Sequence, residues 1–394
     1  MTFDFAITGA KVFNGTDFLD RVTMVVSDRK IASLVADDTL SASVPRLDAG
    51  GAMIVPGFID LQVNGGGGVL LNNQPDVDGI RRICATHARF GTTALLPTLI
   101  TDDVLVRDQA IIAGQHAHAA GVPGFLGLHF EGPHLSVVRK GTHDPALIRP
   151  MTDNDLAVLC AAVGSFGRSL ITIAPENVST DQVKALREAG YVVSLGHTDV
   201  GCAGVAPYVA AGATMVTHLF NAMSQMGNRE PGLVGAALST PALCCGLIAD
   251  GFHVDPITMA IALRAKQGPG RIFLVTDAMS SIGTDEDGFM LNGRQIYRKD
   301  GRLTLADGTL AGADIDMLSC VRFAHQQLGV SMGEAINMAS LYPAEAIGCL
   351  HKGQLAEGMD ADFLILTPGM DLVSTWIGGT CVHSRAPYME PSLP

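Results

Sequence analysis

The sequence lacks an uninterrupted apolar run of about 18 residues, so we expect no helix that crosses a membrane. Its first residues, MTFDFAITGAKVFNGTDFLD, lack the basic start and apolar centre of a secretory signal. Charged residues make up only 16% of the chain, and Asp and Glu outnumber Lys and Arg by 39 to 26. The net charge of −13 argues against sequence-independent binding of nucleic acid, which needs a cationic surface. We therefore expect a soluble, cytoplasmic protein with no nucleic-acid or membrane partner.

The eight cysteines lack the C-x-x-C spacing of many redox and metal sites. Most of them lie in apolar stretches, where a free thiol behaves as a small hydrophobic side chain. We therefore predict reduced, structural cysteines rather than redox-active or metal-binding ones.

The two ends of the chain differ in pattern from its middle. Residues 1–55 and 352–394 contain short alternating segments separated by Gly, Asp and Asn, which is typical of antiparallel strands and turns. Neither end has enough apolar surface to be stable alone, so we predict that they pair as one small β-sandwich domain. Within 56–351, apolar strand-like runs alternate with amphipathic helical stretches, which indicates parallel βα units.

Eight apolar runs can be counted in the middle region, and they fit a (β/α)₈ TIM-type barrel. The runs are GFIDLQV (57–63), TTALLPTLI (92–100), FLGLHFE (125–131), LITIAPE (170–176), VVSLGH (192–197), TMVTHLFN (214–221), GLIADG (246–251) and IFLVTD (272–277). Asn-Gly and Asp-Gly pairs within 283–312 predict a β-hairpin insertion after the eighth strand. A doubly wound open sheet is the alternative, but no G-x-G-x-x-G follows the first strand.

Polar side chains stand where several of these strands end. In a barrel of this type the active site lies at the carboxyl ends of the strands. The residues at those ends are Gln62, Asn64, Glu131, His197, His218 and Asp277. Three nitrogen or oxygen ligands with one open position form the arrangement that a catalytic zinc-type site requires. The sequence therefore predicts a metal centre at this face of the barrel.

A series of short motifs connects the chain to a known family. The motifs PGFIDLQVNG, HFEGPH, SLGHTD, THLFNAM, GNREPG, ADGFHVD and VTDAM follow one another from the first strand to the eighth. In that order they resemble the N-acetylglucosamine-6-phosphate deacetylases of the amidohydrolase superfamily, over nearly the whole chain. The resemblance implies hydrolysis of the acetamide of N-acetylglucosamine 6-phosphate to glucosamine 6-phosphate and acetate, in amino-sugar catabolism and cell-wall recycling. It also implies a homodimer.

The same resemblance implies roles for the residues at the strand ends. Glu131, His197 and His218 would hold one divalent metal per subunit, most simply Zn²⁺, although Fe²⁺, Mn²⁺ and Co²⁺ suit the same ligands. Asp277 would be the general base and acid that serves the metal-activated water. His143 could polarise the acetyl carbonyl or could only shape its loop.

Further residues are implied to contact the substrate. They are Thr142, Asn221, Ala222, Arg229, His253, Leu310, Ala311 and Gly312. Within this set Arg229 and His253 would meet the 6-phosphate, and the loop from Leu310 to Gly312 would close on the N-acyl group. In the implied homodimer Arg229 could serve the active site of the neighbouring subunit.

The first strand departs from the wider superfamily. Many amidohydrolases carry His-x-His there, whose imidazoles bind the buried metal of a two-metal site, whereas this chain has Gln62 and Asn64. A carboxamide is a poor ligand beside an imidazole, so we interpret the pair as a vestigial second metal site and the enzyme as mononuclear. His129 lies two residues before Glu131 and could be a further ligand or a hydrogen-bonding neighbour of one. Two alternatives to this function stay open. One is an amidohydrolase that acts on another N-acyl amino sugar or on a cyclic amide, and the other is a homologue without activity.

Overall fold

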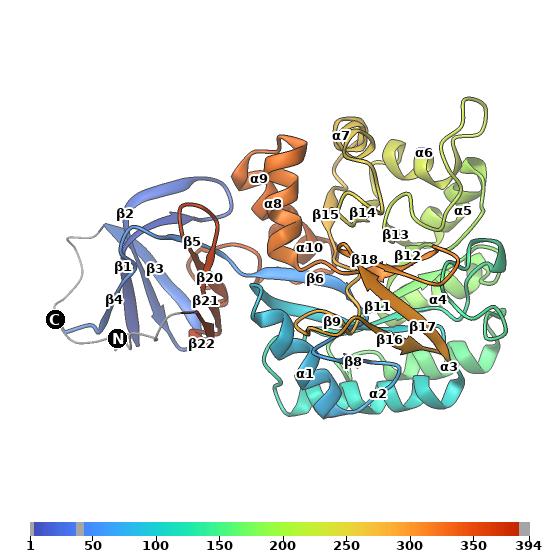
Figure 1. Ribbon diagram of the computed structural model, residues 1–394, viewed down its shortest axis with the longest axis horizontal. Helices are drawn as coiled ribbons and strands as arrows, with labels where there is room; N and C mark the ends of the chain where they lie inside the picture. Colours follow the sequence, from blue (N-terminus) through green and yellow to red (C-terminus); the bar gives the residue numbers. More distant parts are fainter. Residues whose placement is uncertain (1–3, 37–42, 386–394) are drawn as a thin grey trace.

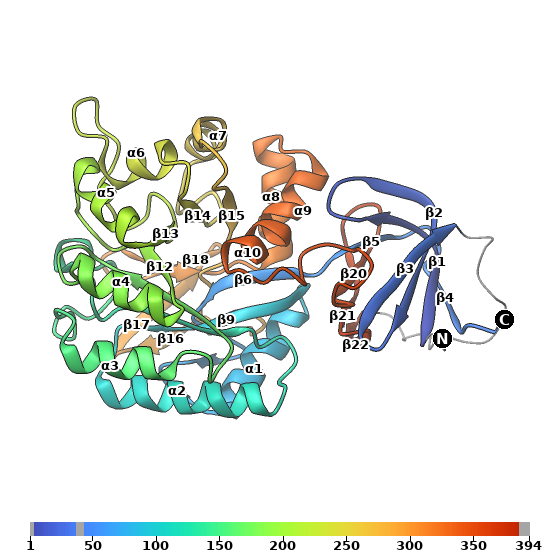
Figure 2. The ribbon, with the colours of Figure 1, turned by 180° about the vertical axis from the view of Figure 1, so that it is seen from behind.

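The computed structural model describes residues 4–36 and 43–385, and Figures 1 and 2 show a barrel beside a smaller β-domain. The β-domain is one curved sheet of eight strands drawn from both ends of the chain. Its strands are β1 (Phe5–Phe13), β2 (Phe18–Ser27), β3 (Lys30–Ala36), β4 (Arg46–Asp48), β5 (Met53–Pro56), β20 (Phe363–Leu366), β21 (Leu372–Ile377) and β22 (Thr380–Ser384). The two ends meet where β5 pairs antiparallel with β20. This sheet has its own apolar core, in which Trp376 stacks on Phe363 with ring centroids 5.2 Å apart.

Eight parallel strands form the barrel, and they follow one another around it in chain order. They are β6 (Phe58–Val63), β9 (Thr92–Ile100), β10 (Gly127–Glu131), β11 (Arg168–Ile173), β12 (Val192–Leu195), β13 (Ala213–Val216), β14 (Cys244–Leu247) and β15 (Ile272–Leu274). The barrel closes just beyond β15, where the Asp277 N–H donates to the Gln62 carbonyl at 2.9 Å and Val63 forms a bridge with Ala278. The predicted (β/α)₈ barrel is confirmed, because each of the eight predicted runs overlaps one of these strands.

Helices cover the outside of the barrel, as Figure 2 shows from the rear. They are α1 (Val77–Ala88), α2 (Val104–Ala119), α3 (Asp153–Ala162), α4 (Thr180–Ala189), α5 (Cys202–Ala211), α6 (Gly232–Ser239), α7 (Pro256–Ala265), α8 (Met317–Leu328), α9 (Met332–Ala339) and α10 (Leu341–Ala346). Local sequence explains where several begin. Asp255 caps α7 and Pro256 occupies its first turn, while Thr152 and Asp155 form a capping box on α3. Among the described residues, no helix has both the length and the apolar character needed to cross a bilayer.

A small antiparallel sheet follows the last barrel strand and lies over the carboxyl ends of the barrel strands. It contains β16 (Gly288–Leu291), β17 (Arg294–Lys299), β18 (Arg302–Thr304) and β19 (Leu310–Ala313). The three turns between these strands contain the Asn292-Gly293, Asp300-Gly301 and Asp307-Gly308 pairs. Leu291, Ile296 and Leu303 belong to a satellite core beneath the sheet. We refer to residues 288–313 as the lid sheet.

The eight cysteines are all unpaired, and Cys84, Cys245, Cys320 and Cys349 are buried. Burial raises the pKa of the Cys84 and Cys245 thiols to about 12, which keeps them protonated and unreactive. The free thiols agree with the prediction of reduced cysteines, and the absence of a redox or metal role stays a prediction.

Candidate functional site

A cavity of about 220 Å³ opens at the carboxyl ends of the barrel strands, beneath the lid sheet. It is lined by Asn64, Ile100, Glu131, Gly141, Thr142, His143, His197, His218, Asn221, Ala222, His253, Asp277, Met279, Thr309, Leu310 and Gly312. Most of the residues selected from the sequence therefore meet in one place. The charged and titratable groups in this lining are two carboxylates and four imidazoles, with no Lys or Arg among them.

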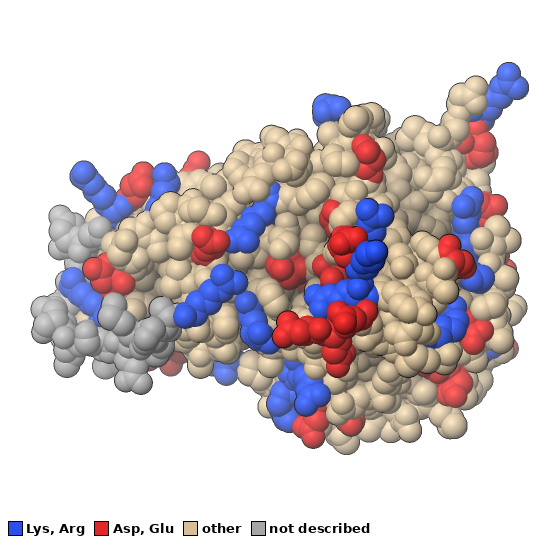
Figure 3. All heavy atoms as spheres, in the orientation of Figure 1, with Lys and Arg blue, Asp and Glu red and all other residues tan. Residues whose placement is uncertain are grey.

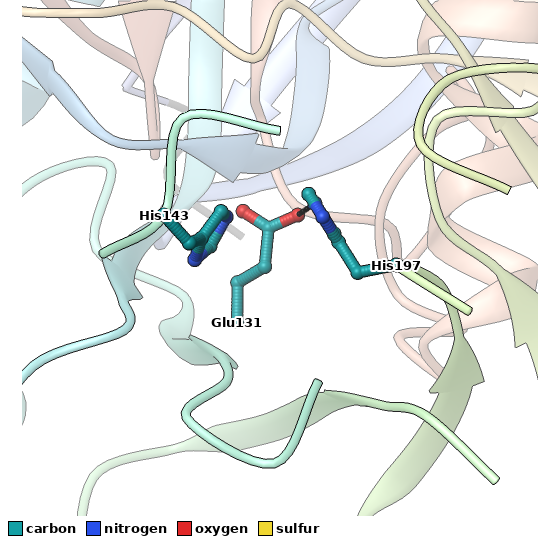
Figure 4. Close-up of side chains that lie close together, drawn as sticks. All are labelled: Glu131, His143 and His197. Carbon is teal, nitrogen blue, oxygen red and sulfur yellow. Dashed lines mark ion pairs between the residues drawn. The ribbon is translucent and has the colours of Figure 1, made fainter. Parts of the chain in front are cut away.

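Three side chains converge at the floor of this cavity. The Nε2 atoms of His197 and His218 lie 3.0 Å apart, and they lie 3.2 and 3.1 Å from Oε1 of Glu131. Glu131 ends β10, while His197 and His218 stand two residues beyond β12 and β13. All three are nearly inaccessible to solvent. Figure 4 shows Glu131 between His197 and His143, with the Glu131–His197 ion pair dashed.

The chemistry of these three groups fits a divalent cation. The Nδ1–H of His197 donates to the Arg139 carbonyl at 2.9 Å, so Nε2 is the ring nitrogen that faces Glu131 and can bind a metal. Two imidazole nitrogens and a carboxylate oxygen are the donor atoms of a His₂Glu site. Ligands of a tetrahedral zinc-type ion stand roughly 3.4 Å apart, given bonds of about 2.1 Å. The observed separations are close to that value, so the three atoms can share one ion.

The pKa shifts of Glu131 and His218 also fit a bound cation. Burial alone would raise the pKa of Glu131, but the hydrogen bonds and charges of His197 and His218 hold it well below its ordinary value. Burial opposes charge on His218, yet Glu131 raises the pKa of this imidazole above its ordinary value. The cluster therefore favours positive charge between the carboxylate and the rings, which a metal ion would provide.

Gln62 and Asn64 bind carboxylates with their side-chain amides. The Gln62 NH₂ group lies 3.1 Å from both Glu131 Oε1 and Asp277 Oδ1, and the Asn64 NH₂ group donates to Asp277 Oδ1 at 2.7 Å. The Gln62 NH₂ group thus stands between the two carboxylates and donates to both of them. Burial and then the Glu131 charge raise the pKa of Asp277 to about 6, which suits a group that exchanges protons.

His143 and His129 occupy different surroundings. The His143 ring lies 4.4 Å from the His197 ring, and its Nδ1 lies 2.7 Å from Thr101 Oγ1. Burial and then the charge of His197 lower its pKa to about 3, so His143 is neutral. His129 is buried outside the cavity lining, where its nitrogens contact Thr98 Oγ1 at 3.3 Å and Thr172 Oγ1 at 2.8 Å. These contacts agree with the hydrogen-bonding alternative for His129.

The residues selected for the sugar fall into two groups. Thr142, Asn221, Ala222, His253, Leu310 and Gly312 line the cavity. Ala311 does not, because alternation along β19 turns its side chain into the satellite core of the lid sheet. Its backbone still lies between two lining residues.

Arg229 lies away from the cavity of its own chain. It is exposed on the segment between β13 and α6, which projects from the barrel between α5 and α6 in Figure 1. Figure 3 shows a basic side chain at the end of that projection. One chain therefore does not bring Arg229 to the other predicted substrate residues.

Sequence reasoning missed four lining residues: Ile100, Gly141, Met279 and Thr309. Ile100 ends β9, so the strand-end argument could have identified it, but its apolar side chain gave no chemical signal. Met279 follows Asp277 by two residues and contacts the Asn64 amide through its sulfur at 3.3 Å. Gly141 has a positive φ of 55°, and a Cβ there would lie 3.4 Å from the His197 ring.

Three of the central residues also have positive φ angles. His197, His218 and Asp277 have φ values of 48°, 27° and 52°. Side chains rarely adopt this left-handed region, which carries a cost of about 1 kcal/mol or more per residue. The turn at each strand end directs the side chain into the cavity.

Comparison with known proteins agrees with this geometry. Residues 53–382 match the Amidohydrolase family. The chain is 40% identical to an N-acetylgalactosamine-6-phosphate deacetylase from Shewanella sp. (strain ANA-3), over 95% of both chains. It is 32% identical to an N-acetylglucosamine-6-phosphate deacetylase from Haemophilus influenzae, over 95% of this chain and 98% of that one. The crystal structure of N-acetylglucosamine-6-phosphate deacetylase from Pasteurella multocida superposes with a TM-score of 0.92 at 33% identity, covering 95% and 98% of the two chains. This chain belongs to the amidohydrolase family, in the branch that contains these deacetylases.

Proposed function

We propose that this protein hydrolyses the acetamide of N-acetylglucosamine 6-phosphate and releases glucosamine 6-phosphate and acetate. The observation that carries the proposal is the convergence of Glu131, His197 and His218 beside Asp277 in one cavity. The family and the names of the relatives support the substrate class.

We propose Glu131, His197 and His218 as the ligands of one divalent metal, with zinc first and iron, manganese or cobalt as options. When bound, such an ion lowers the pKa of water and polarises an acyl oxygen. We propose that the amides of Gln62 and Asn64, which contact Glu131 and Asp277, stand where other amidohydrolases bind a second metal, so that this enzyme is mononuclear.

Asp277 then acts as the proton carrier of the reaction. Its carboxylate takes a proton from the attacking water as the new C–O bond forms, and it returns that proton to the nitrogen as the C–N bond breaks. The Gln62 and Asn64 amides hold Oδ1 of Asp277, which leaves Oδ2 for the water and the leaving nitrogen. Neutral His143, fixed by Thr101, donates a hydrogen bond to the acyl oxygen.

The remaining lining residues are proposed to bind the sugar. Asn221, Ala222 and Thr142 surround its hydroxyl groups, the segment from Leu310 to Gly312 covers the N-acetyl group, and His253 meets the phosphate. Holding the acetamide against the reacting groups converts binding into rate acceleration.

We also propose a homodimer in which Arg229 reaches the cavity of the partner. The exposure of Arg229 and the absence of Lys and Arg from the described cavity lining support this. Mixing two impaired variants tests it: an Asp277→Asn chain and an Arg229→Ala chain should together form dimers with one complete site. Recovery of about a quarter of wild-type activity after subunit exchange is expected from random pairing. No recovery would place Arg229 in its own chain's site.

Acetate release is the direct test of the reaction. Metal-loaded protein should convert N-acetylglucosamine 6-phosphate to equimolar acetate and glucosamine 6-phosphate, and a chelator should stop the reaction. Absence of acetate release by the metal-loaded protein would contradict the proposal.

The C4 epimer is a second candidate substrate. The 40% identical relative from Shewanella is an N-acetylgalactosamine-6-phosphate deacetylase. Comparing kcat/KM for the two phosphorylated epimers decides between them, and a higher value for the galactose form would replace the first proposal with the second.

A further inference from the structure

A buried aspartate contacts the back of His253, on the side away from the cavity. Asp250 Oδ2 accepts the Nδ1–H of His253 at 2.6 Å, and the two side chains are only 5% and 7% exposed. Asp250 Oδ1 accepts the backbone N–H groups of Phe252 and His253 at 2.8 and 2.9 Å. Both carboxylate oxygens of Asp250 therefore accept hydrogen bonds, and the imidazole cannot rotate without breaking its bond to Asp250.

The same turn is held from the lid sheet. The Arg302 guanidinium lies 4.6 Å from the centre of the Phe252 ring, and a Cβ at Gly301 would lie 3.3 Å from that ring. The turn between β17 and β18 thus contacts this segment at Phe252.

The charge of the Asp250–His253 pair matters because the other charged groups that line the cavity are acidic. Its lining contains Glu131 and Asp277 but no Lys or Arg among the described residues. An imidazole that donates Nδ1–H to a carboxylate keeps Nε2 free, and the carboxylate stabilises the protonated ring. Burial would raise the pKa of Asp250, but its hydrogen bond and charge interaction with His253 lower it below the ordinary value, so it stays ionised.

We propose that Asp250 is a positioning residue for phosphate recognition: it fixes the His253 ring and stabilises its positive charge, so that Nε2–H donates to the phosphate of the substrate. This inference rests on the proposed function for its substrate class. It makes the protonated His253 ring, held by Asp250, the positively charged group that one chain contributes to the phosphate end of the cavity. Asp250 itself touches neither the phosphate nor the reacting atoms.

Asp250→Asn tests the charge without removing the turn, because an asparagine side chain supports the same backbone hydrogen bonds. We expect KM for the phosphorylated substrate to rise about 10-fold, with kcat within about twofold, given the strength of charge-assisted bonds. KM for unphosphorylated N-acetylglucosamine should not change. Asp255→Asn is the matched control, since it removes one negative charge from the same segment and keeps the cap of α7.

A double-mutant cycle with His253→Asn separates positioning from general structural damage. If Asp250 acts through His253, Asp250→Asn has no further effect on KM in the His253→Asn background. A further rise in that background, an unchanged KM in Asp250→Asn alone, or equal losses on both sugars would each overturn the proposal.

Inorganic phosphate supplies a readout that does not depend on acetate release. It should raise the Tm of the wild-type protein and of Asp255→Asn, and raise that of Asp250→Asn less. If phosphate stabilises Asp250→Asn as much as wild type, the inference is wrong even where the deacetylase reaction is found. If the wild type releases no acetate but the phosphate effect follows this pattern, the proposed reaction is wrong and the inferred phosphate site stands.

Discussion

The two ends of the cavity are constructed differently. At the proposed metal end, Glu131, His197 and His218 come from strand ends or the two residues after them, and their candidate ligand atoms already lie within 3.2 Å of one another. At the proposed phosphate end, His253 lies on a loop and Arg229 on a projection that leaves the barrel. The barrel alone can therefore preorganise the catalytic cluster, whereas anion recognition relies on loops and, as we propose, on a second subunit.

Charge explains why the ends need different solutions. A cation site can be assembled from the acidic and imidazole groups that are plentiful in this chain. An anion must be attracted in spite of the net charge of −13, and the face in Figure 3 carries basic and acidic side chains side by side without a continuous basic area. Local cations are therefore required at the mouth of the cavity.

Removing a ligand at the metal end should have the largest effect. We expect His218→Ala to lose both the metal and all measurable activity, because two remaining ligands cannot hold a catalytic ion. Elemental analysis with the acetate assay checks this, and His116→Ala on the exposed face of α2 is the control. The wild type should contain about one metal per chain. Two fully occupied metals per chain would contradict the role given to Gln62 and Asn64.

Changing the proton carrier should leave the metal in place and still reduce the rate. Asp277→Asn preserves shape, and we expect kcat to fall by at least about 10²-fold, the usual size of an acid–base contribution. Metal content should equal that of the wild type. Near-normal kcat would move the role to another group, with His143 the first candidate.

Arg229→Ala addresses the phosphate end. We expect kcat/KM for the phosphorylated substrate to fall roughly 10²-fold, about 3 kcal/mol in transition-state terms. Activity on unphosphorylated N-acetylglucosamine should change little, and the metal content should not change. Equal losses on the two substrates would show that Arg229 does not recognise the phosphate, and the proposed difference between the two ends of the cavity would then lack this support.

The smallest loss of activity is expected for a contact between the lid sheet and the loop that contains Thr142 and His143. The Arg294 guanidinium donates to the Thr142 carbonyl, beside His143. Losing a hydrogen bond of about 1.5 kcal/mol from a charged donor should lower kcat/KM about 10-fold for Arg294→Ala. Lys299→Ala, an exposed change on the same strand, should have no effect. If the two variants behave alike, the lid sheet does not hold this loop.

The sequence predicted the metal end better than the phosphate end. Strand ends can be located from apolar runs, and in a barrel all of them point to one face, so Glu131, His197, His218 and Asp277 could be grouped before any coordinates. Loops have no such periodicity. Nothing in GNREPG indicates that its arginine points away from its own cavity, and nothing in ADGFHVD distinguishes Asp250 from any other turn-forming aspartate.

The lid sheet was foreseen only as a hairpin near 283–312. Its Gly-containing turns gave the positions of the bends, but the number of strands depends on tertiary packing of Leu291, Ile296 and Leu303. Ala311 illustrates the same limit, because its direction follows from the register of β19, which local sequence does not specify. The division of the chain at residues 55 and 352 stays a prediction.

The left-handed backbone of His197, His218 and Asp277 has a consequence for the evolution of this protein. Relief of this backbone strain alone would favour glycine at each position, because glycine occupies such conformations without strain. A His218→Gly or Asp277→Gly chain would lose its chemistry but would also lose the backbone strain at that position, about 1 kcal/mol. Inactive descendants of such an enzyme could therefore keep an intact fold. In such a protein, glycines at the ends of the sixth and eighth barrel strands would indicate the position of a former active site.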